Sequence, residues 1–249
     1  KRMLEKELIT DNLLRLNNEL ELFTHTLSHY LTNPLTVLQM GLQFLYSNGH
    51  NISLEKQLSW YKNLLDSVGN IEDIIDNIVL VSQSKNCQLD KDPIPMAFMV
   101  NKIANDVRLL FEANHCQINM GNLLPIWGEK SALYQIFLNV LGNAVKYSAT
   151  QTNPQVSIES QLIDNHVEYK VSDNGIGIPK KDLPQIYEMF TRGANAEHLK
   201  GTGIGLSLVK RIMDRLGATI DIQSEENNGA SIRMRFPMVS DFPTSILHS

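Results

Sequence analysis

The chain has 249 residues, of which 43% are hydrophobic and 20% charged, a balance that excludes a disordered or collagen-like protein and favours two folded domains. Its formal net charge of -5 argues against a protein whose main function is to bind nucleic acid, because binding the phosphate backbone needs a basic surface. The two cysteines fit a reducing, cytoplasmic environment, and because no apolar run approaches roughly 18 residues we expect no direct membrane contact.

The first segment of the chain has the pattern of a long helix that needs a partner. Apolar residues recur in alternating steps of four and three, which makes a heptad seam, at Ile9, Leu13, Leu16, Leu20, Phe23 and Leu27. Turn residues at 47–51 interrupt the pattern, and Ser53 fits the N-cap of a second helix with an apolar stripe from Leu58 to Ile78. Two helices cannot enclose a core, so we expect the hairpin to pair with a second copy in a four-helix bundle, although a helix facing the core of a monomer stays open.

The chain begins at Lys1 rather than at Met, so we expect it to be part of a longer protein. The heptads imply an upstream helix that transmits a signal. We therefore expect the sensing part to lie before Lys1, and the sequence leaves open whether the full-length protein is anchored in a membrane.

Beyond a polar connection at 86–95, the periodicity of the sequence changes repeatedly. Helical patterns span 97–113, 129–147, 180–189 and 203–216. Strand-like alternation spans 155–163, 167–172, 218–223 and 230–236. Strands in antiparallel pairs, with helices between them, predict an α/β sandwich with helices on one face of a mixed sheet. The expected fold class is therefore α+β, a dimerising helical hairpin followed by a sandwich domain.

A carboxylate at the end of a predicted strand opens the first candidate site. Asp173 is followed closely by Gly175 and Gly177, and the missing Cβ atoms let a ligand approach the backbone. The carboxylate can accept a hydrogen bond from an exocyclic amine such as that of adenine. Taken alone, an ordinary glycine-rich turn fits this segment equally well.

A second glycine-rich segment runs over 200–206, directly before a predicted helix. Gly201, Gly203 and Gly205 lead into a helix N-terminus, where unpaired N–H groups and the positive end of the helix dipole favour phosphates. The segment is not the dinucleotide-binding fingerprint, because no strand leads directly into it. It also lacks the Gly-Lys-Ser/Thr ending of a Walker loop.

A third candidate lies within the predicted helix over 129–147. Asn139, Asn143 and Lys146 lie at i, i+4 and i+7 and therefore share one helical face. Two carboxamides and an ammonium group in a line suit a metal ion and the phosphates that it bridges. Taken alone, a solvated polar face is the favoured interpretation of this segment.

Together the three segments resemble, in order and spacing, the N, G1 and G2 boxes of the nucleotide-binding domain of sensor histidine kinases. Residues 186–192 resemble the F box of that family, with Tyr187 in place of the usual first Phe. Upstream, residues 27–35, Leu-Ser-His-Tyr-Leu-Thr-Asn-Pro-Leu, resemble the H box, which is commonly Ser-His-Glu-Leu-Arg-Thr-Pro-Leu. The resemblance covers roughly residues 15–237 and implies a Bergerat-type ATP-binding domain of the GHKL class.

The resemblance implies three parts, two cofactors and two partners. A signalling coiled-coil helix would span 1–22, a dimerisation and histidine-phosphotransfer domain 23–86, and an ATP-binding catalytic domain 92–238. The cofactors would be ATP and Mg²⁺, and the chain would form a homodimer. The receiver domain of a response regulator would dock on the hairpin, through Gln39, Gln43 and the second helix.

The resemblance also assigns roles around the adenine and the metal. Asn143 would ligate Mg²⁺, and Asn139 would support the metal and the phosphates. Asp173 would receive the adenine amino group, while Gly175 and Gly177 would allow close approach of the base.

Further roles implied by the resemblance concern the phosphates and a lid over 187–202. Phe190 would anchor the lid, and Arg192 would either reach the γ-phosphate or remain solvated. The residues implied at the phosphates, the ribose and the lid hinge are Lys146, Tyr147, Gly201, Thr202, Gly203, Gly205 and Leu206.

The phosphoacceptor implied by the resemblance is His29. With Leu27 on the seam, the heptad count turns His29 outward, within reach of a nucleotide domain. An exposed imidazole has a pKa of about 6.5, so much of it is the neutral nucleophile at neutral pH. His25, one turn earlier, is the alternative acceptor.

Two residues of this segment depart from the family pattern. The residue after the acceptor is usually an acid that takes a proton from the attacking histidine, whereas here it is Tyr30, and a phenol with a pKa of about 10 is a poor base at neutral pH. We therefore expect autophosphorylation that is slow, or that relies on a neutral His29 and another proton acceptor. Asn33 replaces the usual Thr one turn from His29, where a carboxamide can align a water, so we expect phosphatase activity toward the regulator.

Two other functions fit parts of the pattern. ATP-hydrolysing chaperones, topoisomerases and mismatch-repair proteins share the nucleotide fold, but they generally have a glutamate at the position of Asn139, and an asparagine cannot act as that base. A dimeric ATP-bound scaffold, or a protein that is chiefly a phosphatase, is the stronger alternative because Tyr30 replaces the acid.

Overall fold

The fold is described by a computed structural model, which covers residues 24, 27, 28, 31–83, 93–113, 115–196, 199 and 201–238. The chain divides into two compact units, Lys1–Asp76 and Asn77–Ser249. Among the described residues, no helix combines the length and the apolar character that crossing a membrane requires.

The first unit is built on a helical hairpin. A helix over 31–48 is followed by the 3-10 turn η1 (Gly49–Asn51) and by helix α2 (Leu54–Gln83). The predicted N-cap is confirmed, because the backbone N–H of Lys56 donates to Ser53 Oγ at 3.4 Å and one unpaired first-turn donor is thereby satisfied. The predicted heptad seam runs from Ile9 to Leu27. Of its residues, Leu27 belongs to the described part of the chain, and the others lie outside it.

The two helices of the hairpin approach each other closely at Gly41. A Cβ atom there would lie 2.8 Å from Leu64 Cδ2 and 3.2 Å from the ring of Trp60, so a larger residue would push the helices apart. The rings of Phe44 and Trp60 lie 5.1 Å apart, and Leu64 and Ile74 are buried. The hairpin therefore has an apolar seam of its own.

A second apolar stripe of α2 is exposed in the single hairpin. Leu58, Leu65 and Ile75 are 58%, 72% and 48% exposed, and Tyr61 and Val68 continue the stripe at the same helical spacing. The stripe predicted from the sequence thus contains residues that do not pack within the hairpin.

The second unit contains a five-stranded mixed sheet with the strand order β1-β2-β3-β5-β4. Strands β1 and β2 are parallel, and the other neighbouring pairs are antiparallel. The strands are β1 (Gln117–Met120), β2 (Gln155–Ile163), β3 (His166–Asp173), β4 (Thr219–Ser224) and β5 (Ala230–Pro237). Four of the five were predicted within two residues at each end, and β1 was missed.

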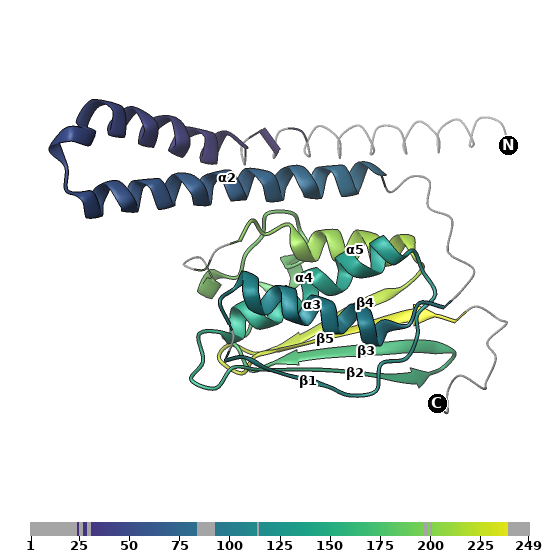
Figure 1. The fold of residues 1–249 in the computed structure, drawn as a ribbon. Coiled ribbons are helices and arrows are strands. Elements are labelled where there is room, and N and C mark those ends of the chain that lie inside the picture. The colour runs from purple at the N-terminus through teal and green to yellow at the C-terminus, as the bar shows by residue number, and fades with distance from the viewer. Residues whose placement is uncertain are drawn as a thin grey trace, which may run out of the picture. The chain divides into compact units, whose positions relative to one another are not determined.

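Helices α3 (Met96–Leu110), α4 (Lys130–Ser148) and α5 (Gly205–Arg215) cover one face of this sheet (Figure 1). Alternate strand residues point into the layer between sheet and helices, where Phe137 of α4, Tyr169 of β3 and Phe236 of β5 form an aromatic cluster with centroids 5.1 to 6.4 Å apart. The predicted α+β sandwich is therefore confirmed.

The predicted helix over 180–189 is wrong. Only the 3-10 turn η2 (Leu183–Gln185) forms there. Pro184 has no N–H to donate within a longer helix. Phe190 has a positive φ of 67°, which is incompatible with a right-handed α-helix. The segment therefore folds as a loop against the rest of the unit.

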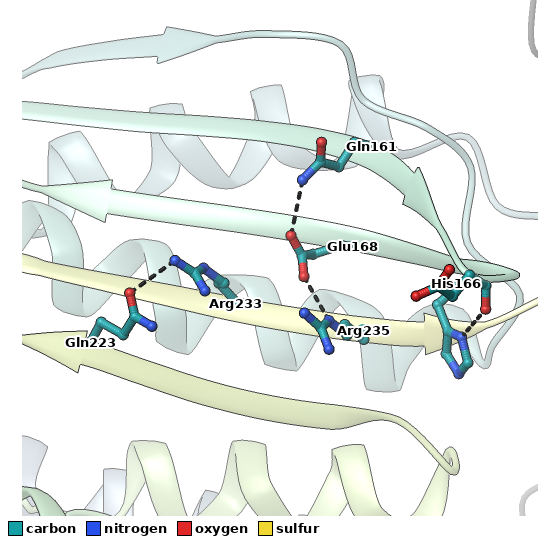
Figure 2. Close-up of polar contacts among 7 residues, drawn as sticks. Gln161, His166, Glu168, Gln223, Arg233 and Arg235 are labelled. Atoms are coloured by element: carbon teal, nitrogen blue, oxygen red, sulfur yellow. Dashed lines mark hydrogen bonds and ion pairs between the residues drawn. The ribbon is translucent and has the colours of Figure 1, made fainter.

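The other face of the sheet carries polar side chains (Figure 2). Glu168 is only 3% exposed and accepts hydrogen bonds from Arg235 Nε at 2.6 Å and from Gln161 Nε2 at 3.1 Å. Arg233 donates to Gln223 at 2.9 Å on the neighbouring strand. The bond from Arg235 holds the pKa of the Glu168 carboxyl below its ordinary value, although burial opposes this.

Replacing Arg235 by methionine is expected to lower the melting temperature at neutral pH more than replacing Arg233 by methionine. The first change leaves the buried Glu168 carboxylate without its cation, whereas the second removes only an exposed bond to Gln223. Because the folded pKa of Glu168 is lowered, the stabilisation is present above its ordinary pKa and is lost as the pH falls through the lowered value. Thermal unfolding of both variants at pH 7 and in strong acid measures this, and equal melting temperatures at pH 7 would contradict it.

Candidate nucleotide-binding site

Helix α4 supplies one side of the candidate site. Asn139 Nδ2 donates to the carbonyl of Gln135 at 2.9 Å, which turns its Oδ1 away from that carbonyl. A Cβ atom at Gly205 would lie 2.6 Å from this Oδ1, so the start of α5 meets α4 where only a glycine leaves room. Asn143 lies one turn further along α4 and is half-buried.

The carboxyl of Asp173 lies at the end of β3. The backbone N–H of Gly175 donates to Asp173 Oδ1 at 2.8 Å. Burial raises the pKa of Asp173 to about 6, while hydrogen bonds from the backbone of Gly175 and Ala230 partly oppose the rise. The half-buried carboxylate is held by backbone N–H groups, and it is suited to accept a further hydrogen bond from a neutral donor.

The loop after β3 lies against the end of α4. A Cβ atom at Gly175 would lie 2.6 Å from the carbonyl oxygen of Tyr147, and the N–H of Ile176 donates to the same oxygen at 3.4 Å. Gly177 has a φ of 65°, and a Cβ atom there would collide with the backbone of Glu225 in the turn between β4 and β5. Both glycines are therefore required by close backbone contacts, before any ligand is considered.

The second glycine segment passes over the same face of α4. A Cβ atom at Gly201 would lie 2.6 Å from Lys146 Nζ. Gly203 has a φ of 73° and accepts a hydrogen bond from the N–H of Phe190 at 2.9 Å, which joins the two ends of the lid. With Gly205 beside Asn139, the start of α5 and the polar face of α4 are brought together.

Lys146 and Tyr147 contact each other at the end of α4. Lys146 Nζ donates to Tyr147 Oη at 3.2 Å and lies 4.4 Å from the centre of the ring. Burial raises the pKa of Tyr147, with the charge of Arg192 acting in the opposite direction. The phenol therefore stays a neutral donor at physiological pH.

The lid residues have mixed outcomes. Phe190 is buried, as expected of an anchor, and Thr202 and Leu206 are half-buried, with Leu206 packed on the core. Arg192 was expected at a phosphate or in solvent. Its guanidinium instead donates to the carbonyls of Ala196 and Leu199 within the lid.

Residues 128–240 match the family of histidine kinase-, DNA gyrase B- and HSP90-like ATPases. The chain is 28% identical over 234 residues to the phosphate regulon sensor protein PhoR of Haemophilus influenzae, covering 92% of this chain and 54% of that protein. This chain is a homologue of the sensor histidine kinases. It is also 26% identical over 205 residues to the histidine-protein kinase/phosphatase MprB of Mycobacterium bovis, covering 81% of this chain and 40% of that one.

Solved histidine kinase structures share the fold. The histidine kinase AdeS of Acinetobacter baumannii has a TM-score of 0.66 at 20% identity, over 84% of this chain and 98% of that one. ShkA in complex with AMPPNP has a TM-score of 0.60 at 20% identity, over 90% and 47% of the two chains. The chain spans about half the length of the curated relatives it matches. It covers 54% of PhoR from Haemophilus influenzae and 49% of PhoR from Pseudomonas aeruginosa.

The residues of this site fit a nucleotide with its magnesium. Asn139 Oδ1 points away from the carbonyl to which its Nδ2 donates, and the amides of Asn139 and the half-buried Asn143 offer oxygen ligands on one face of α4. The described residues contain no cluster of three or more His, Cys, Asp or Glu side chains that could hold a metal ion by themselves. A magnesium ion here would therefore need phosphate oxygens as well as these amides.

The segment at 27–35, which resembles an H box, is only partly described. His29 and Tyr30 lie outside the described residues. Ser28 and Asn33 are exposed, and Thr32 Oγ1 donates to the carbonyl of Ser28 at 2.6 Å, one helical turn away. Asn33 is thus accessible on the hairpin, as are the predicted docking residues Gln39 and Gln43.

Proposed function

We propose that this chain is the dimerisation and catalytic part of a sensor histidine kinase. It transfers the γ-phosphoryl group of ATP to His29 and then passes the group to an aspartate of a response regulator receiver domain. One observation carries the proposal: the loop after Asp173 lies against the end of α4, and the glycine segment at 201–205 lies against the polar face of the same helix. The parts would be the signalling helix at 1–22, the phosphotransfer domain at 23–86 and the catalytic domain at 92–238.

The side chains around α4 have complementary tasks in this proposal. Asp173 binds the adenine amine, and Gly175 and Gly177 hold the loop beside it through their close backbone contacts with Tyr147 and Glu225. Lys146 and the N–H groups at the start of α5 bind phosphates, and Tyr147 donates to a phosphate or to the ribose. Magnesium, held by Asn143 with the support of Asn139, neutralises charge on the phosphates, so that catalysis is mostly positioning and electrostatics.

The exposed apolar stripe of α2 supports a homodimer. Leu58, Tyr61, Leu65 and Val68 would cost free energy if they stayed in water, and their spacing of four and three suits a facing helix. A second copy of the hairpin covers such stripes in a four-helix bundle. The exposed Gln39 and Gln43, with the second helix, would then be available to a docked regulator.

Tyr30 favours a second candidate function. A site that binds ATP but lacks a base next to the histidine phosphorylates slowly and acts chiefly as a phosphatase or a dimeric scaffold. Asn33 is compatible with this second function, because its carboxamide aligns water without needing to accept a proton.

Incubation of the chain with ATP labelled at the γ-phosphate and with Mg²⁺ tests the proposal. A kinase acquires label that is lost in acid and stable in alkali, because the phosphoryl group is bonded to nitrogen, and an added receiver domain then removes the label. Slower loss of label from the receiver with Asn33→Ala supports the phosphatase activity. Nucleotide binding without label favours the second candidate, and the absence of both rejects the proposal.

Replacing Tyr30 by glutamate is expected to speed this labelling roughly tenfold or more, because a carboxylate takes the proton that leaves the imidazole. Tyr30→Phe is the matched control, since it keeps the ring and adds no base. Initial rates at saturating ATP measure the effect. An unchanged rate in Tyr30→Glu would show that the missing acid does not limit the reaction.

A further inference from the structure

One side chain of the lid, Asn195, binds the loop that follows Asp173. Asn195 Nδ2 donates to the carbonyls of Ile176 at 3.2 Å and of Gly177 at 3.1 Å. Both neighbours are acceptors, so the orientation of the amide follows from its surroundings. Its Oδ1 is buried and has no hydrogen-bond partner among the described residues.

Other contacts hold Asn195 in place. The N–H of Ala194 donates to Asp182 Oδ2 at 2.9 Å, and the N–H of Ala196 donates to the carbonyl of Gly193 at 2.8 Å, which forms the 3-10 turn η3 (Ala194–Ala196). Arg192 donates to the carbonyl of Ala196 at the end of that turn. The amide is thus presented by an ordered segment.

The loop that receives these bonds is itself fixed to the sheet. The carbonyl of Ile176 also accepts from the N–H of Asn227 at 2.7 Å, and the N–H of Ile178 donates to Ser224 Oγ at 2.9 Å. Gly177 lies directly against the backbone of Glu225. Asn195 therefore connects the lid to a loop that is itself hydrogen-bonded to the end of β4 and to the turn that follows it.

We infer that Asn195 is a positioning residue that fastens the lid segment 192–196 to the loop after Asp173 and thereby slows the release of nucleotide. The inference rests on the proposed ATP site, because the fastened loop is the one that would hold the adenine. Release requires the lid and this loop to separate, and Asn195 contributes two hydrogen bonds to their contact. Loss of two such bonds corresponds to an increase in the release rate on the order of tenfold.

The test is the dissociation rate of a fluorescently labelled ADP from the full chain, measured by stopped flow after mixing with excess ATP. Asn195→Ala removes both bonds, and Asn195→Asp replaces the donor by an oxygen that faces two carbonyls. Asn101→Ala is the matched control, since Asn101 is an exposed amide on α3 that donates to the carbonyl of Ala97. We expect release about tenfold faster in both Asn195 variants and unchanged in the control.

The pH dependence separates positioning from a loss of fold. Burial and the two facing carbonyls disfavour the ionised carboxyl of Asn195→Asp and therefore raise its pKa. Its protonated form can donate one of the two bonds, so this variant is expected to recover part of the slow release at pH 5. Asn195→Ala has no such group and shows no recovery. The titration of Asp173 near pH 6 affects all variants alike. The ratio of the release rates of Asn195→Asp and Asn195→Ala therefore reports the effect of the side chain at position 195.

Backbone amide exchange gives a second measurement. Faster exchange at Ala194 and Ala196 with unchanged exchange in β3 supports the inference, whereas faster exchange throughout β3 means a general loss of structure and overturns it. Wild-type release rates in both Asn195 variants also overturn it. A wild-type chain that binds no nucleotide refutes the proposed function itself, and with it this inference.

Discussion

Replacing His29 by alanine is expected to abolish the acid-labile labelling of the chain by Mg-ATP while nucleotide affinity stays unchanged. In the proposed transfer, an imidazole nitrogen attacks the γ-phosphorus, the bond from phosphorus to the ADP oxygen breaks, and the ring gives up a proton. Alanine offers no nucleophile for this step, so the expected loss is complete. Only the neutral ring has a free nitrogen lone pair, so wild-type labelling should fall as the pH drops through about 6.5.

His25→Ala is the matched control for this substitution, because it removes an imidazole one helical turn earlier in the same segment. Labelling of the control at the wild-type rate is expected. Label that persists in His29→Ala and disappears in His25→Ala would move the acceptor to His25. Nucleotide titrations of both variants confirm that the catalytic domain is intact.

The periodic elements of the fold could be predicted because their patterns are local. Alternation in β2 and β3 gave both strands, and the two residues between them, Asp164 and Asn165, take the positive φ values that short polar side chains tolerate. Strand β1 has only four residues, which is too short for alternation to stand out, and it forms by pairing in parallel with a strand distant in sequence. Local pattern cannot reveal such a strand.

The glycine segments were recognised from the sequence, but the reasons for individual glycines were not. Gly177 was expected to admit a ligand, whereas in the structure its hydrogen faces the backbone of Glu225. Gly205 faces the amide of Asn139, which also could not be foreseen. These contacts join segments far apart in the chain, so only the folded structure shows which residue each glycine accommodates.

Asn195 and Arg192 show the same limit within the lid. No motif marks Asn195, because its partners are backbone carbonyls whose position depends on the fold of the preceding loop. The resemblance placed Arg192 either at the γ-phosphate or in solvent, yet its described partners are also carbonyls. A side chain that binds backbone leaves little trace in the composition of the sequence, whereas the boxes that bind a nucleotide combine several residue types at fixed spacing.

Replacing Asp173 by asparagine is expected to weaken ATP binding by about 100-fold. The carboxylate can accept from the N–H of Gly175 with one oxygen and from the adenine amine with the other. An asparagine has a single acceptor oxygen, and its NH₂ group would face a donor. Losing a charge-assisted bond and leaving donors unpaired costs about 3 kcal/mol, which corresponds to about a hundredfold in affinity. Calorimetric titration with ATP at pH 7.5 measures the change.

The same substitution is expected to remove the pH dependence of binding without destabilising the fold. Burial raises the folded pKa of Asp173 from the ordinary 3.8 to about 6. The ionised carboxyl therefore lowers the free energy of unfolding. This loss grows as the pH rises from the ordinary pKa to the folded pKa, and above the folded pKa it reaches at most about 3 kcal/mol. A neutral amide at this position avoids that cost, so Asp173→Asn should melt at or above the wild-type temperature at pH 7. Because the amine prefers the ionised form, wild-type affinity should rise through pH 6 and the variant's should not. A variant that melts well below the wild type would instead mark Asp173 as a residue that mainly holds the loop, with its effect on ATP indirect.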